Sequence, residues 1–462
     1  MANDIVLTTY DTLRSEWSTS RSDSVLYHNH SGWARIVLDE DRKVLANLLM
    51  IVKKAHHIRS RSSQIFQATC DLRARYRWCL TGTPIHNTLD DYAALLAFIR
   101  VAPFTGPSGK LAFANLIDSP LHSFDKHEIG IRRLRKLIAA TCLRRTKDHV
   151  QDQLRLPSRI EKVHYIDLTH EERRIYDFFK SRASSLVGNL SQKSHMDKTS
   201  WSTMLSIIGF LRLICNHGGQ LLPQAAIEMY NKQNPSAVHP LSKITRPSEV
   251  STCPSGLSID SLPGSPESLM PFDNLGRTDY QPSSKVSALI GNILSEQLVN
   301  KSISEGIPVK SVIFSFWTKM LDLIEIALRK NGIFFQRIDG KTSVGHRSLV
   351  LKRFNEDLNC TVILASIGAV AEGVDLTAAS SVHLVEPQWN PMVEAQAVDR
   401  VHRIGQCRSV TVTRYIVKDS IENYVQGIQQ AKLRFVQQSF GDTNTDQESL
   451  KNARLQVSIL IR

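Results

Sequence analysis

The sequence has no apolar run long enough to cross a bilayer and no leader typical of secretion. Its apolar stretches, such as the one around residues 363–370, fall well short of the ~20 residues that a spanning helix needs. The N-terminal MANDIVL lacks the basic stretch and the apolar core of a secretory signal. These absences favour a globular protein without a membrane partner.

Cysteine is also scarce. The 462 residues include seven cysteines, and no two of them form a C-x-x-C pair. The histidines complete no zinc-type spacing, so we expect no zinc site. Cys215-Asn216-His217 is the nearest approach to half of a metal site, and a structural role at a helix end is the favoured interpretation. Free thiols fit the reducing conditions of the cytosol or the nucleus.

What the composition does contain is ordinary for a globular protein. Hydrophobic residues make up 42% and charged residues 22% of the chain, which excludes a wholly disordered, collagen-like or disulfide-scaffold protein. Lysine and arginine number 57 against 44 aspartates and glutamates, a formal net charge of +13. An excess of positive charge favours polyanionic partners, with nucleic acid first among them.

Apolar spacing divides the chain into two kinds of segment. Buried strands are predicted at 5–7, 35–38 and 78–80, a helix at 90–100, and further helices at 128–140, 169–187 and 201–215. From residue 285 the pattern alternates. A helix is predicted at 285–298, strands at 311–314, 334–337, 361–365, 382–385 and 411–417, and helices at 318–330, 345–355 and 391–402. Such alternation predicts an α/β protein with a doubly wound parallel sheet, whose ligands lie at the carboxyl ends of its strands.

Two acids end the predicted strand RIVLDE, Asp39 and Glu40. A buried strand that delivers paired carboxylates to a sheet edge suits Mg²⁺ and an activated water. Taken alone, a strand that ends in Asp-Glu is more often a solvated turn.

Two arginines stand three residues apart in QAVDRVHRIGQ, at Arg400 and Arg403. On a helix they would project from one face, as a pair of guanidinium groups that grip a phosphate would. The alternative is a surface helix with scattered charges.

The stretch TVILASIGAVAEGVDLTAASSVHLVEPQWNPMVEAQAVDRVHRIGQ at 361–406 closely resembles the last motifs of the Swi/Snf-type DNA-dependent ATPases. VIFSFWTKMLDLIEIAL at 312–328 and RIDGKTS at 337–343 are similar to the motifs that open the second lobe in that family.

Earlier segments carry the same resemblance. LTGTPIHN at 80–87 is similar to the family's third helicase motif, while LRRTK at 143–147 and LRLICNH at 211–217 resemble its helical insertion. RWCL at 77–80, with the acids at 90 and 91, resembles the branch that contains helicase-like transcription factor and the Rad-type post-replication repair translocases.

The resemblance implies two RecA-like lobes, with ATP between them and double-stranded DNA across both. The implied divisions are the C-terminal part of lobe one at 1–100, a helical insertion at 101–230, a disordered linker rich in Ser, Pro and Gly at 231–284, a complete lobe two at 285–440 and a tail at 441–462. The linker holds only Cys253, so we do not expect the RING-type zinc module of this branch.

The resemblance also implies roles for single residues. Asp39 would hold Mg²⁺ and Glu40 would polarise the hydrolytic water, with Arg400 and Arg403 as catalytic arginines. The residues implied in ATP binding and in its coupling to DNA are His56, Thr81, Gly82, Thr83, Gly373, Asp375, Thr377 and Gln396. The implied DNA contacts are Arg144, Arg145 and Lys147, for which a solvated helix face is the alternative.

The sequence departs from the family in two further places. It contains no phosphate-cradling loop of the form G-x-x-x-x-G-K-S/T, so we expect the chain to begin partway through lobe one. Residues 41–54 separate Asp39-Glu40 from the AHHIR at 55–59, and removing them restores VLDEAHHIR. We interpret this insert as a retained intron or gene-model error, or, if genuine, as an apolar, helix-compatible excursion.

The sequence therefore predicts the parent function of an ATP-dependent DNA translocase that remodels chromatin or acts in DNA repair, located in the nucleus, with ATP and Mg²⁺ as cofactors. For the chain as given we expect little or no ATP hydrolysis. The alternative from another class is a non-catalytic DNA- or chromatin-binding fragment. A third hypothesis is that the fragment does not fold stably, because half of a parallel sheet leaves strand edges open.

Overall fold

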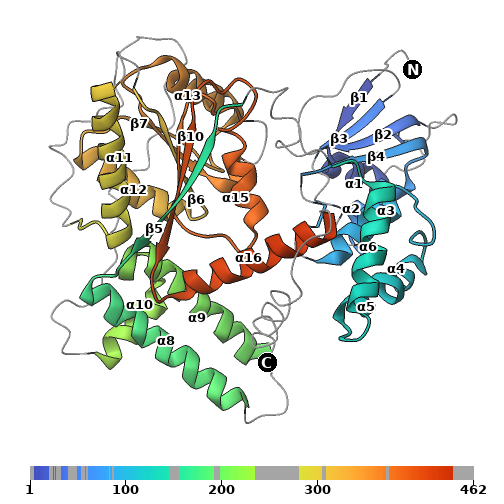
Figure 1. Ribbon diagram of the computed structural model, residues 1–462, viewed down its shortest axis with the longest axis horizontal. Coiled ribbons are helices and arrows are strands. Elements are labelled where there is room, and N and C mark those ends of the chain that lie inside the picture. Colours follow the sequence, from blue (N-terminus) through green and yellow to red (C-terminus); the bar gives the residue numbers. More distant parts are fainter. Residues whose placement is uncertain are drawn as a thin grey trace.

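The computed structural model describes residues 5–19, 24, 26–27, 33–39, 49–53, 58, 61–82, 84–85, 88–144, 156–191, 198–234, 280–303, 308–370 and 374–440. They form two α/β units, each built on its own parallel sheet (Figure 1). Most of the expected linker and the whole of the expected tail lie outside the described residues.

The first unit is a four-stranded sheet in the order β1-β3-β2-β4, with every pair parallel. Its strands are β1 (Ile5–Thr8), β2 (Trp33–Asp39), β3 (Leu49–Lys53) and β4 (Ala74–Leu80). Helices α1 (Tyr10–Thr19), α2 (Gln64–Asp71) and α3 (Leu89–Phe98) pack with it around one apolar core. Ile36 and Leu38 of β2 point into that core, because alternate residues of a strand share a face.

The opposite face of this sheet carries exposed apolar side chains. Tyr76 and Trp78 of β4 are 48% and 47% exposed, and Leu7 of β1 is 67% exposed. The guanidinium carbon of Arg35 lies 4.4 Å from the centre of the Trp78 ring. Parallel sheets normally have both faces covered. Among the described residues, this sheet has one face covered with helices and one that is largely open.

Part of the insert at 41–54 is a strand, whereas we expected a genuine insert to be a helix-compatible excursion. Residues 49–53 form β3, which pairs with β1 on one side and with β2 on the other. The run LMIVK is apolar and rich in residues that favour strands, so a central position in a sheet suits it better than an exposed helix.

A small helical block follows the first sheet. It comprises α4 (Gly109–Phe113), a π-helical turn (Ala114–Asp118), α5 (Ser119–His122) and α6 (His127–Thr141). Leu134 and Ile138 of α6 pack with Phe104 and Phe113 in a core of their own.

The second unit is a six-stranded parallel sheet in the order β5-β10-β9-β6-β8-β7. Its strands are β5 (Arg159–Ile166), β6 (Ser311–Ser315), β7 (Phe335–Ile338), β8 (Val362–Ser366), β9 (Ser381–Leu384) and β10 (Val410–Val417). All residues of β6, β8 and β9 are buried, as expected for a sheet covered on both faces.

Helices cover both faces of this sheet (Figure 1). One face packs against α11 (Ser284–Ile303) and α12 (Thr318–Lys330), and the other against α13 (Val344–Glu356), α14 (Ile367–Val370) and α15 (Pro391–Val398). Ser343 caps α13 and Asn390 caps α15 through their side chains. The expected α/β fold class with parallel sheets is therefore confirmed, and the second sheet is doubly wound.

Strand β5 is the main surprise in the second unit. It lies in the region expected to be helical, yet it pairs with β10 along its whole length, from Val410↔Arg159 to Val417↔Ile166. After β5 the chain forms α8 (His170–Ser191), α9 (Lys198–His217), a 3₁₀ turn (Gly218–Leu221) and α10 (Gln224–Gln233). These helices share one apolar core with α11 and α12, so residues 156–234 belong physically to the second unit.

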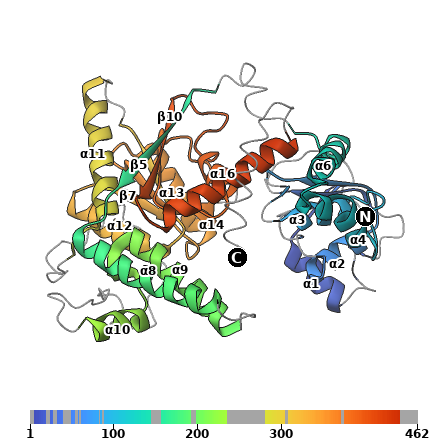
Figure 2. The ribbon, with the colours of Figure 1, turned by 60° about the horizontal axis from the view of Figure 1, so that its bottom comes forward.

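The last described helix, α16 (Ile421–Phe440), joins the two units. It begins just after β10 and runs to α6 of the first unit, as both ribbon views show (Figures 1 and 2). At its far end Arg135 Nε of α6 donates to the Gln438 carbonyl oxygen at 2.6 Å, and Phe435 and Phe440 pack against the α6 core.

Candidate nucleotide and DNA site

In the second unit, the structure brings two predicted segments together at the amino ends of the strands, just before β9 and β10 begin. The Leu376 amide donates to the Arg400 carbonyl oxygen at 3.1 Å. The side chain of Asp375 accepts a hydrogen bond from the Thr377 amide at 3.0 Å, which shapes the loop that follows α14. Asp375 and Thr377 are therefore held beside the turn that carries Arg400.

Gln406 links these two segments through hydrogen bonds. Its side-chain amide nitrogen donates to the carbonyl oxygens of Thr377 at 3.1 Å, Ala379 at 2.8 Å and Val401 at 3.1 Å. Its side-chain oxygen accepts from the backbone amides of residues 407 and 408. Gln406 is buried, so these bonds satisfy backbone groups that water does not reach. Gln406 ends the motif QAVDRVHRIGQ, and its sequence pattern alone predicted no role for it.

The two arginines do not lie on one helix face, contrary to the sequence prediction. Helix α15 ends at Val398 instead of residue 402, and both arginines follow in tight turns. Arg400 and Val401 donate their backbone amides to residues three positions earlier, which tightens the chain away from α-helical geometry. Arg400 is 8% exposed, whereas Arg403 is half-buried. Gln396 lies on α15 itself and is also half-buried.

The first unit holds the other half of the predicted site. Asp39 is the last residue of β2 and lies in register with Leu80, the last residue of β4. Thr81 and Gly82, which follow β4, therefore leave the sheet at the same edge as Asp39. The predicted residues Glu40, His56, Thr83 and Gly373 lie outside the described residues.

The predicted DNA contacts fall at the end of the α6 segment. The guanidinium of Arg144 lies 5.3 Å from the centre of the Phe440 ring of α16. Arg145 and Lys147 lie outside the described residues. Because Arg135 of the same basic segment also bonds α16, part of this positive charge serves the contact between the two units.

The Cys-Asn-His segment lies at the end of α9. His217 ends α9, is buried, and lies with its Nε2 3.1 Å from the Tyr280 hydroxyl. Burial lowers the pKa of His217 to about 4 and raises the pKa of the Cys215 thiol. Within the described ranges no group of three or more His, Cys, Asp or Glu has the geometry of a metal site. The helix-end interpretation is confirmed.

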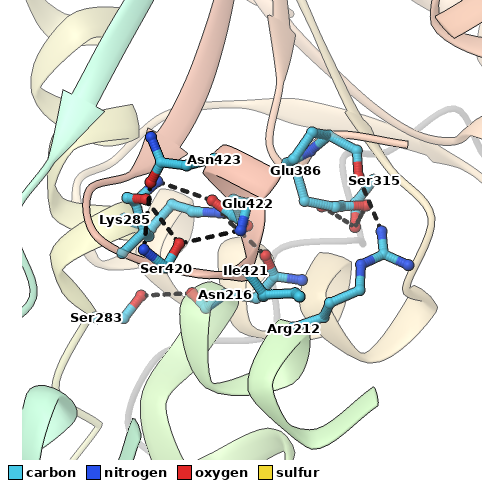
Figure 3. A network of polar contacts seen from close by, with 12 residues as sticks. Arg212, Asn216, Ser283, Lys285, Ser315, Glu386, Ser420, Ile421, Glu422 and Asn423 are labelled. Carbon is cyan, nitrogen blue, oxygen red and sulfur yellow. Dashed lines mark hydrogen bonds and ion pairs between the residues drawn. The ribbon is translucent and has the colours of Figure 1, made fainter. Parts of the chain in front are cut away.

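A buried polar network, which sequence reasoning missed, lies at the opposite edge of the second sheet, where β6, β9 and β10 end (Figure 3). Lys285 of α11 donates to Glu422 of α16 at 2.6 Å and to Asn216 of α9 at 3.2 Å. Glu386 accepts hydrogen bonds from the Ser315 hydroxyl and the backbone amide of residue 316. Full burial raises the pKa of Glu386 to about 7.

Two domain families match the sequence of this chain. Residues 45–220 match the SNF2-related domain, and residues 292–405 match the helicase conserved C-terminal domain. The chain therefore carries the two domains that its motifs indicated.

Three curated relatives are similar to most of the chain. DNA repair protein RAD5B from Arabidopsis thaliana is 30% identical over 98% of this chain and 38% of its own length. A putative SWI/SNF-related matrix-associated actin-dependent regulator of chromatin, subfamily A member 3-like 1, from the same plant is 33% identical over 95% of this chain and 52% of its own length. Helicase-like transcription factor from Mus musculus is 30% identical over 98% of this chain and 48% of its own length. The chain thus spans between 38% and 52% of the length of these relatives.

Among solved structures, the C-terminal part of the Fun30 ATPase domain is 23% identical and covers 66% of this chain and 97% of its own, with a TM-score of 0.43. In the described part of the chain, no helix is long and apolar enough to cross a membrane.

Proposed function

We propose that this chain carries the core of a DNA-dependent ATPase motor that moves along double-stranded DNA in DNA repair or chromatin remodelling, and that it acts in the nucleus. One observation supports the proposal best. Hydrogen bonds from Gln406 and the Leu376–Arg400 bond hold the Asp375 loop against residues 399–403, called the arginine turn below. The names of the relatives, a repair protein and a chromatin regulator, point in the same direction.

In this proposal the arginine turn binds phosphate. Arg400 and Arg403 supply guanidinium groups to the terminal phosphates of ATP, for which planar cations are well suited. An arginine at this place in phosphoryl transfer contributes roughly 10³–10⁵ in rate. Gln396 approaches the nucleotide from α15, and the loop with Gly373, Asp375 and Thr377 relays the nucleotide state to DNA.

In the first unit, Asp39 would hold the Mg²⁺ that accompanies ATP. The register of β2 and β4 supports this role, because it pairs the backbone of Asp39 with that of Leu80 where both strands end. Carboxylates are among the ligands that Mg²⁺ takes from proteins. Mg²⁺ usually keeps several waters and uses one or two carboxylates together with the phosphates, so it needs no larger cluster of acids. When bound, Mg²⁺-ATP supplies the phosphoryl group, while Glu40 orients the attacking water.

Hydrolysis by these 462 residues alone should be weak, because they contain no G-x-x-x-x-G-K-S/T loop to cradle the β- and γ-phosphates. A phosphate-release assay with and without duplex DNA tests this. We expect rates near background for the unchanged chain, for Arg403→Ala and for Arg329→Ala, a control on the surface of α12. DNA-stimulated turnover that Arg403→Ala abolishes would overturn the expectation of weak hydrolysis.

The second candidate is a DNA- or chromatin-binding fragment without catalysis. The basic residues of α6 and the 144–147 segment favour it, because they offer positive charge independent of any nucleotide. Such binding should fall steeply with salt and should be the same with and without an ATP analogue. A motor core should instead change its DNA affinity when the analogue is added.

A further inference from the structure

The segment between β9 and α15, residues 386–390, is irregular and almost wholly buried. Buried backbone carbonyls outside helices and sheets need partners from elsewhere, because an unpaired polar group away from water is costly. This segment leads directly into α15, which carries Gln396 and ends just before Arg400. Whatever fixes its backbone also fixes the start of α15.

Three consecutive carbonyl oxygens of this segment are each bonded by a long side chain from another element. Arg212 of α9 donates to the Pro387 carbonyl at 2.9 Å. Gln429 of α16 donates to the Gln388 carbonyl. Lys432 of α16 donates to the Trp389 carbonyl at 3.1 Å.

The side chains of the segment are held as firmly as its backbone. The guanidinium of Arg212 lies 5.5 Å from the centre of the Trp389 ring and 6.0 Å from that of Trp317. Figure 3 shows Arg212 reaching from α9 toward Ser315 and Glu386 at the strand ends. Gln429 also donates to the buried carboxylate of Glu394, which accepts from the Gln388 amide at 2.8 Å.

Two of the three donors come from α16, whose far end contacts the first unit. Arg135 of α6 bonds the Gln438 carbonyl, and Phe440 packs against the α6 core. From residue 429 to residue 438 the helix rises roughly 14 Å at 1.5 Å per residue. A displacement of α6 relative to the second sheet therefore acts on the helix that carries Gln429 and Lys432.

We propose that Arg212, Gln429 and Lys432 are positioning residues, which hold α15 and the arginine turn that follows it. When α6 moves relative to the second sheet, α16 transmits the movement to Gln429 and Lys432. The link to nucleotide rests on the proposed function, since it takes Arg400 and Arg403 as phosphate ligands. The link between α6 and Trp389 does not depend on it.

Fluorine NMR of the full chain with 5-fluorotryptophan tests the link between α6 and Trp389 without nucleotide. The chain has six tryptophans, and Trp389→Phe assigns the resonance of interest. Gln429→Leu and Lys432→Met should each shift that resonance by more than its linewidth. Arg135→Met should do so as well, although Arg135 lies on α6 in the other unit. Lys418→Met, which removes an exposed lysine paired with Asp167, is the matched control and should leave it in place.

A Trp389 resonance that does not move in Arg135→Met would overturn the role of α16, provided the variant keeps the melting curve of the unchanged chain. Where Arg135→Met proves unstable, Phe440→Leu offers a milder change at the same contact and is judged by the same shift.

The effect on nucleotide is measured by titration with a fluorescent ATP analogue. The double variant Gln429→Leu/Lys432→Met should weaken binding by about tenfold, the equivalent of ~1.4 kcal/mol. Among single variants, Lys432→Met should lose affinity for the analogue. Lys432→Arg keeps a donor to the Trp389 carbonyl and should retain most of the affinity of the unchanged chain. If the unchanged chain binds no analogue while the Trp389 resonance responds as expected, the proposed function fails and the positioning role stands. If the analogue binds equally well to the unchanged chain and the double variant, the positioning role fails.

Discussion

Lys285 and Glu422 form an ion pair with 2.6 Å between Nζ and Oε1, and each side chain is only 1% exposed. The pair joins the start of α11 to the start of α16, which are far apart in sequence. Glu422 also accepts from the Val417 amide at 2.8 Å, so its carboxylate is bonded on both oxygens. The charges are thus buried together with their hydrogen-bond partners, as buried ions require.

Removing one member of this pair should be far more harmful than removing both. Lys285→Met leaves Glu422 buried without its cation, and we expect a loss of about 3–5 kcal/mol in the free energy of unfolding. Lys285→Met/Glu422→Gln should recover a large part of that loss. Urea denaturation of the two variants measures the difference. A single variant as stable as the double would contradict the assignment of a buried charge pair.

Stability should fall as pH rises through the range in which Glu386 ionises. Burial raises its pKa in the folded protein to about 7, above the ordinary value of 4.5. Between these pH values the folded state binds more protons than the unfolded state, so the free energy of unfolding decreases with rising pH. The total decrease should be at most about 3 kcal/mol between pH 4.5 and pH 7, since each pKa unit corresponds to 1.36 kcal/mol.

Glu386→Gln should remove this dependence while keeping an acceptor for the Phe316 amide. Urea midpoints at pH 5 and pH 8 make the comparison, with Glu228→Gln on the surface of α10 as the control. The variant should gain stability relative to the unchanged chain at pH 8 and not at pH 5. Equal pH profiles for the two would show that Glu386 is ionised throughout.

Gln406 should be essential for the loop that holds Asp375 and Thr377. Gln406→Glu keeps the shape of the side chain but replaces a donor to three carbonyls with a negative charge. At about 1 kcal/mol for each lost hydrogen bond and more for a buried charge, the free energy of unfolding should fall by at least ~3 kcal/mol. Gln406→Leu should cost less. Cys407→Ser, at an exposed neighbour, should be neutral in thermal unfolding, and a neutral Gln406→Glu would contradict the role.

The open face of the first sheet should tolerate polar residues. Trp78→Thr removes an exposed ring and its contact with Arg35, at a cost of about 1 kcal/mol or less. It should also reduce the binding of a hydrophobic dye. Trp33→Thr is the contrasting change, because Trp33 is buried and its Nε1 donates to the Leu26 carbonyl at 3.1 Å. It should cost about 3–5 kcal/mol. Equal losses would mean that the exposed face is covered in solution.

The structural unit that includes lobe two should be larger than residues 285–440. Strand β5 forms the edge of its sheet, and Ile175, Phe179 and Ile214 belong to its core. When a protease site engineered between residues 235 and 279 is cut, the two pieces should stay together in size-exclusion chromatography. The piece from 280 onward, expressed alone, should show no cooperative melting. A stable fold of that piece by itself would show that β5 is dispensable.

The sequence pattern predicted the strands that are buried on both faces, because a continuous apolar run such as that of β6 leaves little choice of conformation. It missed β5, whose run RIEKVHYI is mostly exposed and charged at the sheet edge. It missed β3 because residues 41–54 interrupt a family motif and were interpreted as an insertion into it, not as a segment with a strand of its own. The buried network could not be read from the sequence, since Lys285 and Glu422 are 137 positions apart and only the fold brings them together. The arginine turn was misread as helix because a spacing of three fits both a helix and a tightened turn.

In the proposed function, the arginine turn of the second unit binds the phosphates of ATP. The most direct test of this binding is a titration of the full chain with a fluorescent ATP analogue in the presence of Mg²⁺ and duplex DNA. We expect saturable binding by the unchanged chain and by the control Arg329→Ala, and loss of binding in Arg400→Ala/Arg403→Ala with the fold intact. Equal affinity in the double variant, or no binding by the unchanged chain, would contradict it.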